Sequence, residues 1–132
     1  MSTNYYVCSV GEPGKEYDDA NLIRCINNCC FVLHSANSQK GSYKEIKDND
    51  VLLLKYKGKI IAYGRATSDW IDNPSIDDGW RITIPVNVWI VGNPISNYGI
   101  KNAQKYGSPY ATVKNVTKEF ALEKMNQIGS PF

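Results

Sequence analysis

The stretch VLLLKYKGKIIAYGRA, residues 51–66, decides the fold. Its first six residues form an almost continuous apolar run, a Lys-Gly-Lys turn occupies residues 57–59, and β-forming residues return at 60–66. This pattern predicts a β-hairpin. Because residues 51–54 are apolar at every position, both faces of the first strand must be covered. We therefore expect this strand at the centre of a sheet or closed barrel, not at an edge.

The segments before the hairpin predict a strand and a helix. Residues 5–10, YYVCSV, are rich in β-formers and end at a Gly- and Pro-containing loop. Asp18 and Asp19 can cap a helix that extends through Cys30. The residues spaced to face the core on this helix are Leu22, Ile23 and Ile26. Residues 31–33 then predict a short strand, which leads into an exposed polar loop at 35–42.

The segments after the hairpin predict a loop, a long strand and a second helix. Residues 68–79 predict an acidic loop, and residues 81–91 predict a strand with Trp89 on the face opposite to its apolar row. The apolar row is Ile82, Ile84, Val86, Val88 and Ile90. Since Pro85 lacks an N–H donor, the strand should lie at an edge or carry a bulge. After a loop or short helix at 93–107, Thr117 caps the final helix. The chain is thus expected to be one α+β domain, a small barrel-like sheet with helices packed outside.

The composition is that of a soluble globular domain. The chain has 132 residues, of which 42% are hydrophobic and 21% charged, enough for one domain and too few for two. No secretory signal and no apolar run of about 20 residues is present, so we expect a cytoplasmic protein with no membrane partner. Four cysteines without a signal are expected to be reduced thiols. The last helix stops beside the chain terminus, which is typical of an excised module.

Few residues suit catalysis. His34 is the only histidine, and the C-x3-C-C spacing of Cys25, Cys29 and Cys30 lacks the paired knuckles of a zinc site. The sequence holds no glycine-rich phosphate loop. A nucleophile at Cys8 or Ser9 with His34 as its base is an alternative, but nothing in the sequence brings them together. We expect a binding domain, not an enzyme, with no cofactor and no metal.

Tryptophans mark the candidate binding site. Trp70 and Trp80 flank the polar loop, whereas Trp89 lies within the predicted strand and suits core packing. An unstacked base fits between aromatic faces, and each stacking contact contributes about 1–3 kcal/mol. Burial of the two rings in the core is the alternative interpretation.

Basic residues cluster in one part of the sequence. Residues 79–118 contain no acid. The bases in this stretch are Arg81, Lys101, Lys105, Lys114 and Lys118. Such a stretch can contact a phosphate backbone. It can equally be a solvated face.

Five stretches stand out along the chain: YVCS (6–9), VLLL (51–54), YGRA (63–66), GWR (79–81) and IPVNVWI (84–90). With the order of the elements, they resemble the PUA-like superfamily, especially its YTH and EVE branches. The similarity covers nearly the whole chain. The resemblance implies a PUA-like mixed sheet and an aromatic cage for a modified base. The early cage tryptophan of the family is absent from CFVL, residues 30–33, which leaves the third wall open.

The resemblance also implies residue roles and partners. Trp80 and Trp70 would be two walls of the cage, Phe31 or His34 a third, and Ser9 and Cys8 would contact the base edge. The residues implied to hold phosphates are Arg81, Lys101, Lys105 and Lys114. Similar bacterial modules belong to modification-dependent restriction systems of the Mcr type, which implies methylated DNA more than RNA, and a fused or partnered NTPase or nuclease.

A protein-binding module is the main rival hypothesis. The same tryptophans could hold a methylated ammonium by cation–π attraction. Acidic residues of the loop would complement its charge: Asp69, Asp72, Asp77 and Asp78.

Overall fold

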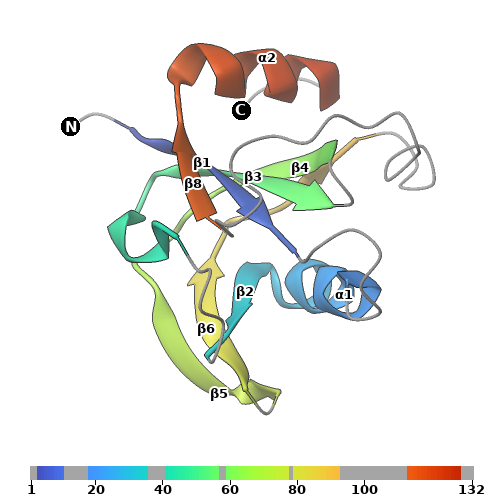
Figure 1. Ribbon diagram of the computed structural model, residues 1–132, viewed down its shortest axis with the longest axis vertical. Helices are drawn as coiled ribbons and strands as arrows, with labels where there is room; N and C mark the ends of the chain where they lie inside the picture. Colours follow the sequence, from blue (N-terminus) through green and yellow to red (C-terminus); the bar gives the residue numbers. More distant parts are fainter. Residues whose placement is uncertain are drawn as a thin grey trace.

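The computed structural model describes residues 3–10, 18–35, 41–56, 59–77, 79–92 and 113–128 (Figure 1). These residues form two α-helices, a short 3-10 helix and eight strands in two sheets. In chain order the elements are β1 (Tyr5–Ser9), α1 (Asp18–Asn28), β2 (Cys30–His34), η1 (Tyr43–Glu45), β3 (Val51–Tyr56), β4 (Lys59–Arg65), β5 (Ile71–Asp77), β6 (Trp80–Pro85), β7 (Ile90–Val91), β8 (Val113–Val116) and α2 (Lys118–Ile128).

Strand β3 is the middle strand of the larger sheet, whose order is β7-β4-β3-β1-β8. It pairs antiparallel with β4, as the hairpin pattern predicts, and parallel with β1. At one edge of the sheet β7 pairs antiparallel with β4, and at the other edge β8 pairs antiparallel with β1. The predicted hairpin and its central position are therefore confirmed.

Two hydrophobic cores lie on the two faces of this sheet. Val51 and Leu53 face α2, where they join a cluster that includes Met125. Leu52 and Leu54 point the other way, into a larger cluster shared with the smaller sheet and α1. Figure 1 shows the same layers, with α2 above the five-stranded sheet and the smaller sheet and α1 below it. Each of these buried side chains contributes about 1.5–3 kcal/mol to stability, so both cores depend on this strand.

The smaller sheet contains a strand where we predicted a loop. Its order is β2-β6-β5, and β5 occupies much of the acidic segment. Backbone pairing of Ile71 with Thr83 and of Asp72 with Ile82 holds β5 against β6. The acidic composition suits an edge strand, which is paired on one side only. Pro74 lies where the register shifts, between Asp72 and Asp77. The loop prediction was wrong because the amino-acid composition of a segment does not show whether its backbone pairs with a neighbouring strand.

The predicted strand over residues 81–91 is broken into two. β6 ends at Pro85, and β7 begins only at Ile90, in the other sheet. Pro85 thus lies at the end of a central strand, not at an edge. Between them an isolated bridge joins Val86 to Ala66, which connects the two sheets. Ile82, Ile84 and Val86 are buried as predicted, but Val88 is 47% exposed.

Trp89 belongs to the core, as predicted. Its ring is buried, and its indole N–H donates a hydrogen bond to the carbonyl of Cys25 on α1 (3.0 Å). Since α1 also packs on β2, this bond anchors the helix to the segment that leads into the larger sheet.

Helix α1 is shorter than predicted. It ends at Asn28, Cys29 has a positive φ of 50°, and Cys30 begins β2 instead of ending the helix. A left-handed residue at this place terminates a helix. Leu22 and Cys25 face the core, but Ile23 is 57% exposed and does not. The short strand predicted at residues 31–33 is confirmed as β2.

The C-terminal part confirms one prediction and adds an element. Thr117 caps α2, because its Oγ1 accepts a hydrogen bond from the N–H of Phe120 (3.1 Å). Strand β8 was not predicted, since its VKNV sequence is short and half polar. The α+β class is confirmed, and the described strands form two sheets without closing a barrel. The predicted segments at 36–40 and 93–107 lie outside the described residues.

Helices long and apolar enough to cross a membrane are absent from the described part of the chain.

Replacing Trp89 by Phe tests its packing role. We expect Trp89→Phe to lower the free energy of unfolding by about 1–3 kcal/mol, because it removes the bond to Cys25 and leaves unfilled volume. Urea denaturation measures the loss. Val88→Ala, at the exposed neighbour, should stay within about 0.5 kcal/mol of wild type. Equal stability of Trp89→Phe and wild type would contradict the role.

Candidate functional site

Trp80 and His34 meet where β6 pairs with β2. The two residues are paired across the strands, beyond a register shift between Leu33 and His34. Their rings lie 5.2 Å apart at 88°, an edge-to-face contact. Both side chains are half-buried, and Trp80 packs on the larger core. Each ring is therefore fixed by packing while part of it stays accessible.

Gly79 sets the position of the histidine. It has a φ of +81°, a left-handed conformation that glycine adopts without cost. A β-carbon at this position would collide with the His34 imidazole. The carbonyl of Gly79 also accepts a hydrogen bond from the N–H of Ser35 (2.6 Å), which ties the end of β2 to the start of β6. The close approach of this backbone restricts where the His34 imidazole can lie.

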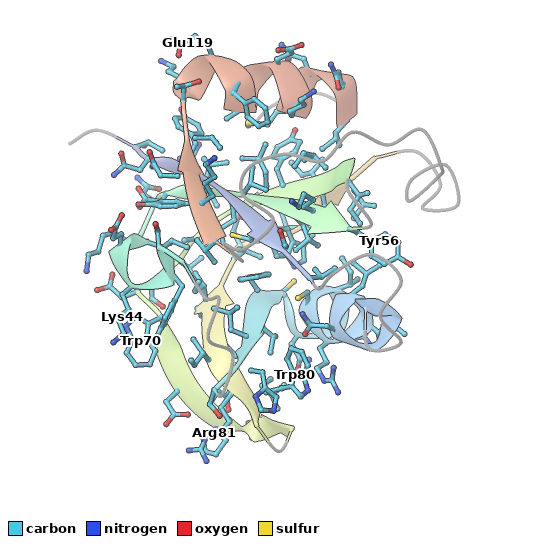
Figure 2. All side chains as sticks on the ribbon, viewed as in Figure 1. Lys44, Tyr56, Trp70, Trp80, Arg81 and Glu119 are labelled. Atoms are coloured by element: carbon cyan, nitrogen blue, oxygen red, sulfur yellow. The ribbon has the colours of Figure 1, made fainter. Side chains whose placement is uncertain are left out.

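Arg24 adds a positive charge to the two rings. It comes from α1, and its guanidinium carbon lies 4.6 Å from the centroid of the Trp80 ring. A cation over an indole face at this distance is a favourable cation–π contact. Figure 2 shows Trp80 beside α1. Trp80, His34 and Arg24, from three different elements, are called the Trp80 cluster below.

Trp70 lies elsewhere. The residue is 37% exposed, and its ring makes an edge-to-face contact with Tyr43 of η1, at 5.6 Å and 73°. Lys44 lies on the same side, with its Nζ 5.9 Å from the Tyr43 ring. Figure 2 shows Trp70 and Lys44 together, on the other side of β5 and β6 from Trp80.

The structure does not bring the two tryptophans together as walls of one cage. Ile71, next to Trp70, pairs with Thr83. Thr83 is three residues along β6 from Trp80, which corresponds to about 10 Å along a strand. The loop in which both tryptophans were predicted is instead a hairpin that separates them.

Two other predicted cage residues are inside the core. Phe31 and Cys8 are fully buried and offer no surface to a ligand in this conformation. Ser9 ends β1 in the larger sheet and is half-buried. Among the predicted cage residues that are partly accessible, Trp80 and His34 are in ring contact with each other.

The buried thiols do not favour nucleophilic catalysis. Burial raises the pKa of Cys8 well above its usual value. Burial is also the main cause of the raised pKa of Cys25. Burial, with a smaller effect of Cys29, raises the pKa of Cys30 to about 11. Because the thiolate is the reactive form, these thiols are poor nucleophiles near neutral pH. The burial of Cys8 and its raised pKa therefore do not favour it as a nucleophile with His34 as its base.

Two of the acids beside the tryptophans, Asp69 and Asp72, are paired with bases. Asp69 contacts Lys47 at 3.3 Å, and Asp72 accepts two hydrogen bonds from Arg81, at 2.9 and 3.2 Å. These groups are well exposed, so each pair contributes little to stability. They nevertheless reduce the local net charge. Asp78 lies outside the described residues, and the Asp77 side chain is likewise not described.

The predicted phosphate contacts do not form one described surface. Arg81 is engaged by Asp72, and Lys114 is exposed on β8 in the other sheet. In Figure 1 β8 descends from α2, whereas β6 lies in the lower part of the molecule. Lys101 and Lys105 lie outside the described residues. Within the described ranges no three His, Cys, Asp or Glu side chains are grouped so as to hold a metal ion.

Two residues of the site were missed by sequence reasoning. Arg24 is one of several polar residues on an amphipathic helix, and its distance from Trp80 along the chain hides the contact. Gly79 stands beside Trp80 in the sequence, but only its φ and the nearby imidazole reveal its role. A glycine directly before an aromatic strand start was the one local signal available.

Comparison with known proteins gives the fold alone. No protein-family model and no curated protein matches the chain. The crystal structure of protein Atu2648 from Agrobacterium tumefaciens is similar, with a TM-score of 0.55 and 14% sequence identity. The match covers 98% of this chain and 100% of that one. The arrangement of elements is thus one that a crystal structure also contains.

A substitution at Gly79 tests how the rings are positioned. We expect Gly79→Ala to lower the free energy of unfolding by about 1–3 kcal/mol, through backbone strain and collision with His34. Urea denaturation measures it. Ser35→Ala, which keeps the backbone hydrogen bond, is the matched control. If the collision with the imidazole contributes, Gly79→Ala should lower the free energy of unfolding by less in a His34→Ala background than in wild type. An equal loss in both backgrounds would mean that backbone strain alone is responsible.

Thiol reactivity tests the buried cysteines. We expect one thiol of the native protein, Cys29, to react quickly with a chromogenic disulfide reagent at pH 8, because the other three are buried. Cys29→Ala should abolish this fast phase, and all of the remaining thiols should react in urea. Fast reaction of Cys8 in the native state would show that its surroundings open to solvent.

Proposed function

We propose that this domain binds nucleic acid and holds one unpaired or flipped base against the Trp80 cluster. The observation that carries the proposal is the convergence of an indole, an imidazole and a guanidinium from β6, β2 and α1. Aromatic and guanidinium planes are the groups on which proteins stack unpaired bases. No other described group of side chains combines the three.

The energetics of base binding suit this cluster. Stacking on an aromatic side chain contributes about 1–3 kcal/mol per base, and extrusion of a base from a duplex costs a few kcal/mol. Because Gly79 and the strand pairing already hold the rings, little ordering is required when the ligand binds. Contacts of the Trp80 cluster can therefore offset much of the extrusion cost.

The charge at Trp80 disfavours the rival ligand, a methylated ammonium. The guanidinium of Arg24 already lies over the indole and would repel a second cation. At Trp70 the nearby acid Asp69 is paired with Lys47. A neutral planar base avoids both problems, so the nucleic-acid hypothesis is preferred.

The proposal extends to the kind of nucleic acid. The resemblance of residues 79–90 to the YTH and EVE pattern supports membership of the PUA-like superfamily, and with it a methylated base, in DNA more than RNA. Recognition of such a base within a restriction system of the Mcr type would follow. Trp80 and His34 would form two sides of the site, and Arg24, not Trp70, would lie beside them.

Titration of short labelled oligonucleotides, with and without 5-methylcytosine or N6-methyladenine, tests the proposal. We expect Trp80→Ala to weaken binding by about 10- to 100-fold through lost stacking, and Trp80→Phe to restore much of it. Trp70→Ala, on the other side of the hairpin, is the matched control and should bind as wild type does. If Trp80→Ala, still folded by circular dichroism, binds equally well, the site is wrong. If wild type binds no oligonucleotide at low salt, the function is wrong.

A further inference from the structure

We propose that the Trp70 end of β5 binds a short extended segment of another protein, one that carries apolar side chains next to a carboxylate. Trp70, Ile71, Tyr43 and Lys44 are called the Trp70 surface below. Trp70 is 37% exposed and Ile71 45%, so two large apolar residues that are neighbours in the chain both reach solvent. This surface lies on the other side of the β5–β6 hairpin from the Trp80 cluster and is independent of the function proposed for that cluster.

The ring of Trp70 is already positioned by its own neighbours. Its edge-to-face contact with Tyr43 joins it to η1, and Tyr43 is itself buried in the larger core. Tryptophan and tyrosine are among the residues most enriched in the hot spots of protein interfaces. Because a fixed ring loses little conformational freedom on binding, much of the free energy of its contacts is retained as affinity.

The backbone of β5 adds hydrogen-bonding groups to the Trp70 surface. Among the described strands β5 pairs with β6 alone, through Ile71 and Asp72 at this end. Neighbouring residues of an antiparallel strand direct their N–H and C=O groups to opposite sides, so one of these two residues directs them away from β6. An extended peptide pairs with such an edge through its own backbone, which a nucleic-acid strand lacks.

Only a short stretch of this edge can pair. Pro74 has no N–H, and the backbone N–H of Ser75 already donates to the side chain of Asn73 (3.1 Å). Proline on an edge strand protects it from unselective pairing. The partner strand is therefore confined to the residues before Pro74, where contacts with the side chains of Trp70 and Ile71 must supply most of the affinity.

Lys44 determines the charge of the partner. The described acids closest to Trp70 in the sequence already have basic partners. The two ion pairs are Lys47 with Asp69 and Arg81 with Asp72. Lys44 belongs to neither pair; it is exposed, and its Nζ lies 5.9 Å from the Tyr43 ring. A carboxylate complements an exposed cation beside an apolar surface, so the Trp70 surface favours an acidic segment over a basic one.

Titration of short peptides, followed by nitrogen–proton correlation spectra of the full chain, tests the proposal. The probes are capped peptides of about six residues in which valine and threonine alternate, with one central threonine replaced by glutamate, glutamine or lysine. We expect them to shift the amide resonances of Ile71 and Asp72 and the indole resonance of Trp70. The affinities should fall in the order glutamate, glutamine, lysine, by up to about fivefold at each step, as for one exposed ion pair.

Two variants and a control separate the parts of the Trp70 surface. Lys44→Glu should reverse the order of the peptides, because the charge beside Trp70 changes sign. Trp70→Ala should weaken all of them by about tenfold or more, since it removes the apolar anchor. Lys114→Glu makes the same charge change at an exposed lysine on β8 in the other sheet, and should leave the order unchanged.

Several results would overturn the proposal. If the peptides shift none of these resonances, or if Lys44→Glu keeps the wild-type order, no acidic segment binds here. If the same resonances shift with protein concentration alone, the occupant is a second copy of the chain. If they shift with single-stranded DNA, the occupant is nucleic acid. Oligonucleotide binding that depends on Trp80 is measured separately, so the proposed function stands or fails on its own.

Discussion

The burial of β3 on both faces is the constraint on which the rest of the structure depends. Val51 and Leu53 need cover from one side, and Leu52 and Leu54 from the other. A single sheet cannot provide both. The fold meets the need with α2 on one face and with the smaller sheet and α1 on the other. The layer that carries the candidate site is thus present because β3 must be covered.

The attachment of the smaller sheet determines where the site lies. It is joined to the larger sheet at one end, through the bridge of Ala66 with Val86. Trp80 begins β6 at the other end, away from that junction. A large ring placed there packs one side on the core and leaves another accessible. The same arrangement that fills the core therefore leaves an aromatic surface next to α1.

The pairing of β5 with β6 decides which aromatic residues can act together. The segment between Trp70 and Trp80 is polar enough to suggest a loop, and in a loop the rings could approach each other. Because this segment is instead an edge strand, Trp70 contacts Tyr43 and Trp80 contacts His34. Any residue except proline can donate a backbone hydrogen bond, so this segment forms a strand although its side chains are mostly polar.

The sequence by itself determined the hairpin, the central position of β3, the α+β class, the cap of α2 by Thr117 and the burial of Trp89. These features depend on local patterns of apolar side chains and on capping, which are visible along the chain. Only the tertiary structure decided the strand β5, the break at Pro85, and the grouping of Trp80 with His34 and Arg24. Those features depend on contacts between elements far apart in the sequence. Such contacts produce no periodic pattern of residues along the chain, so they could not be predicted from it.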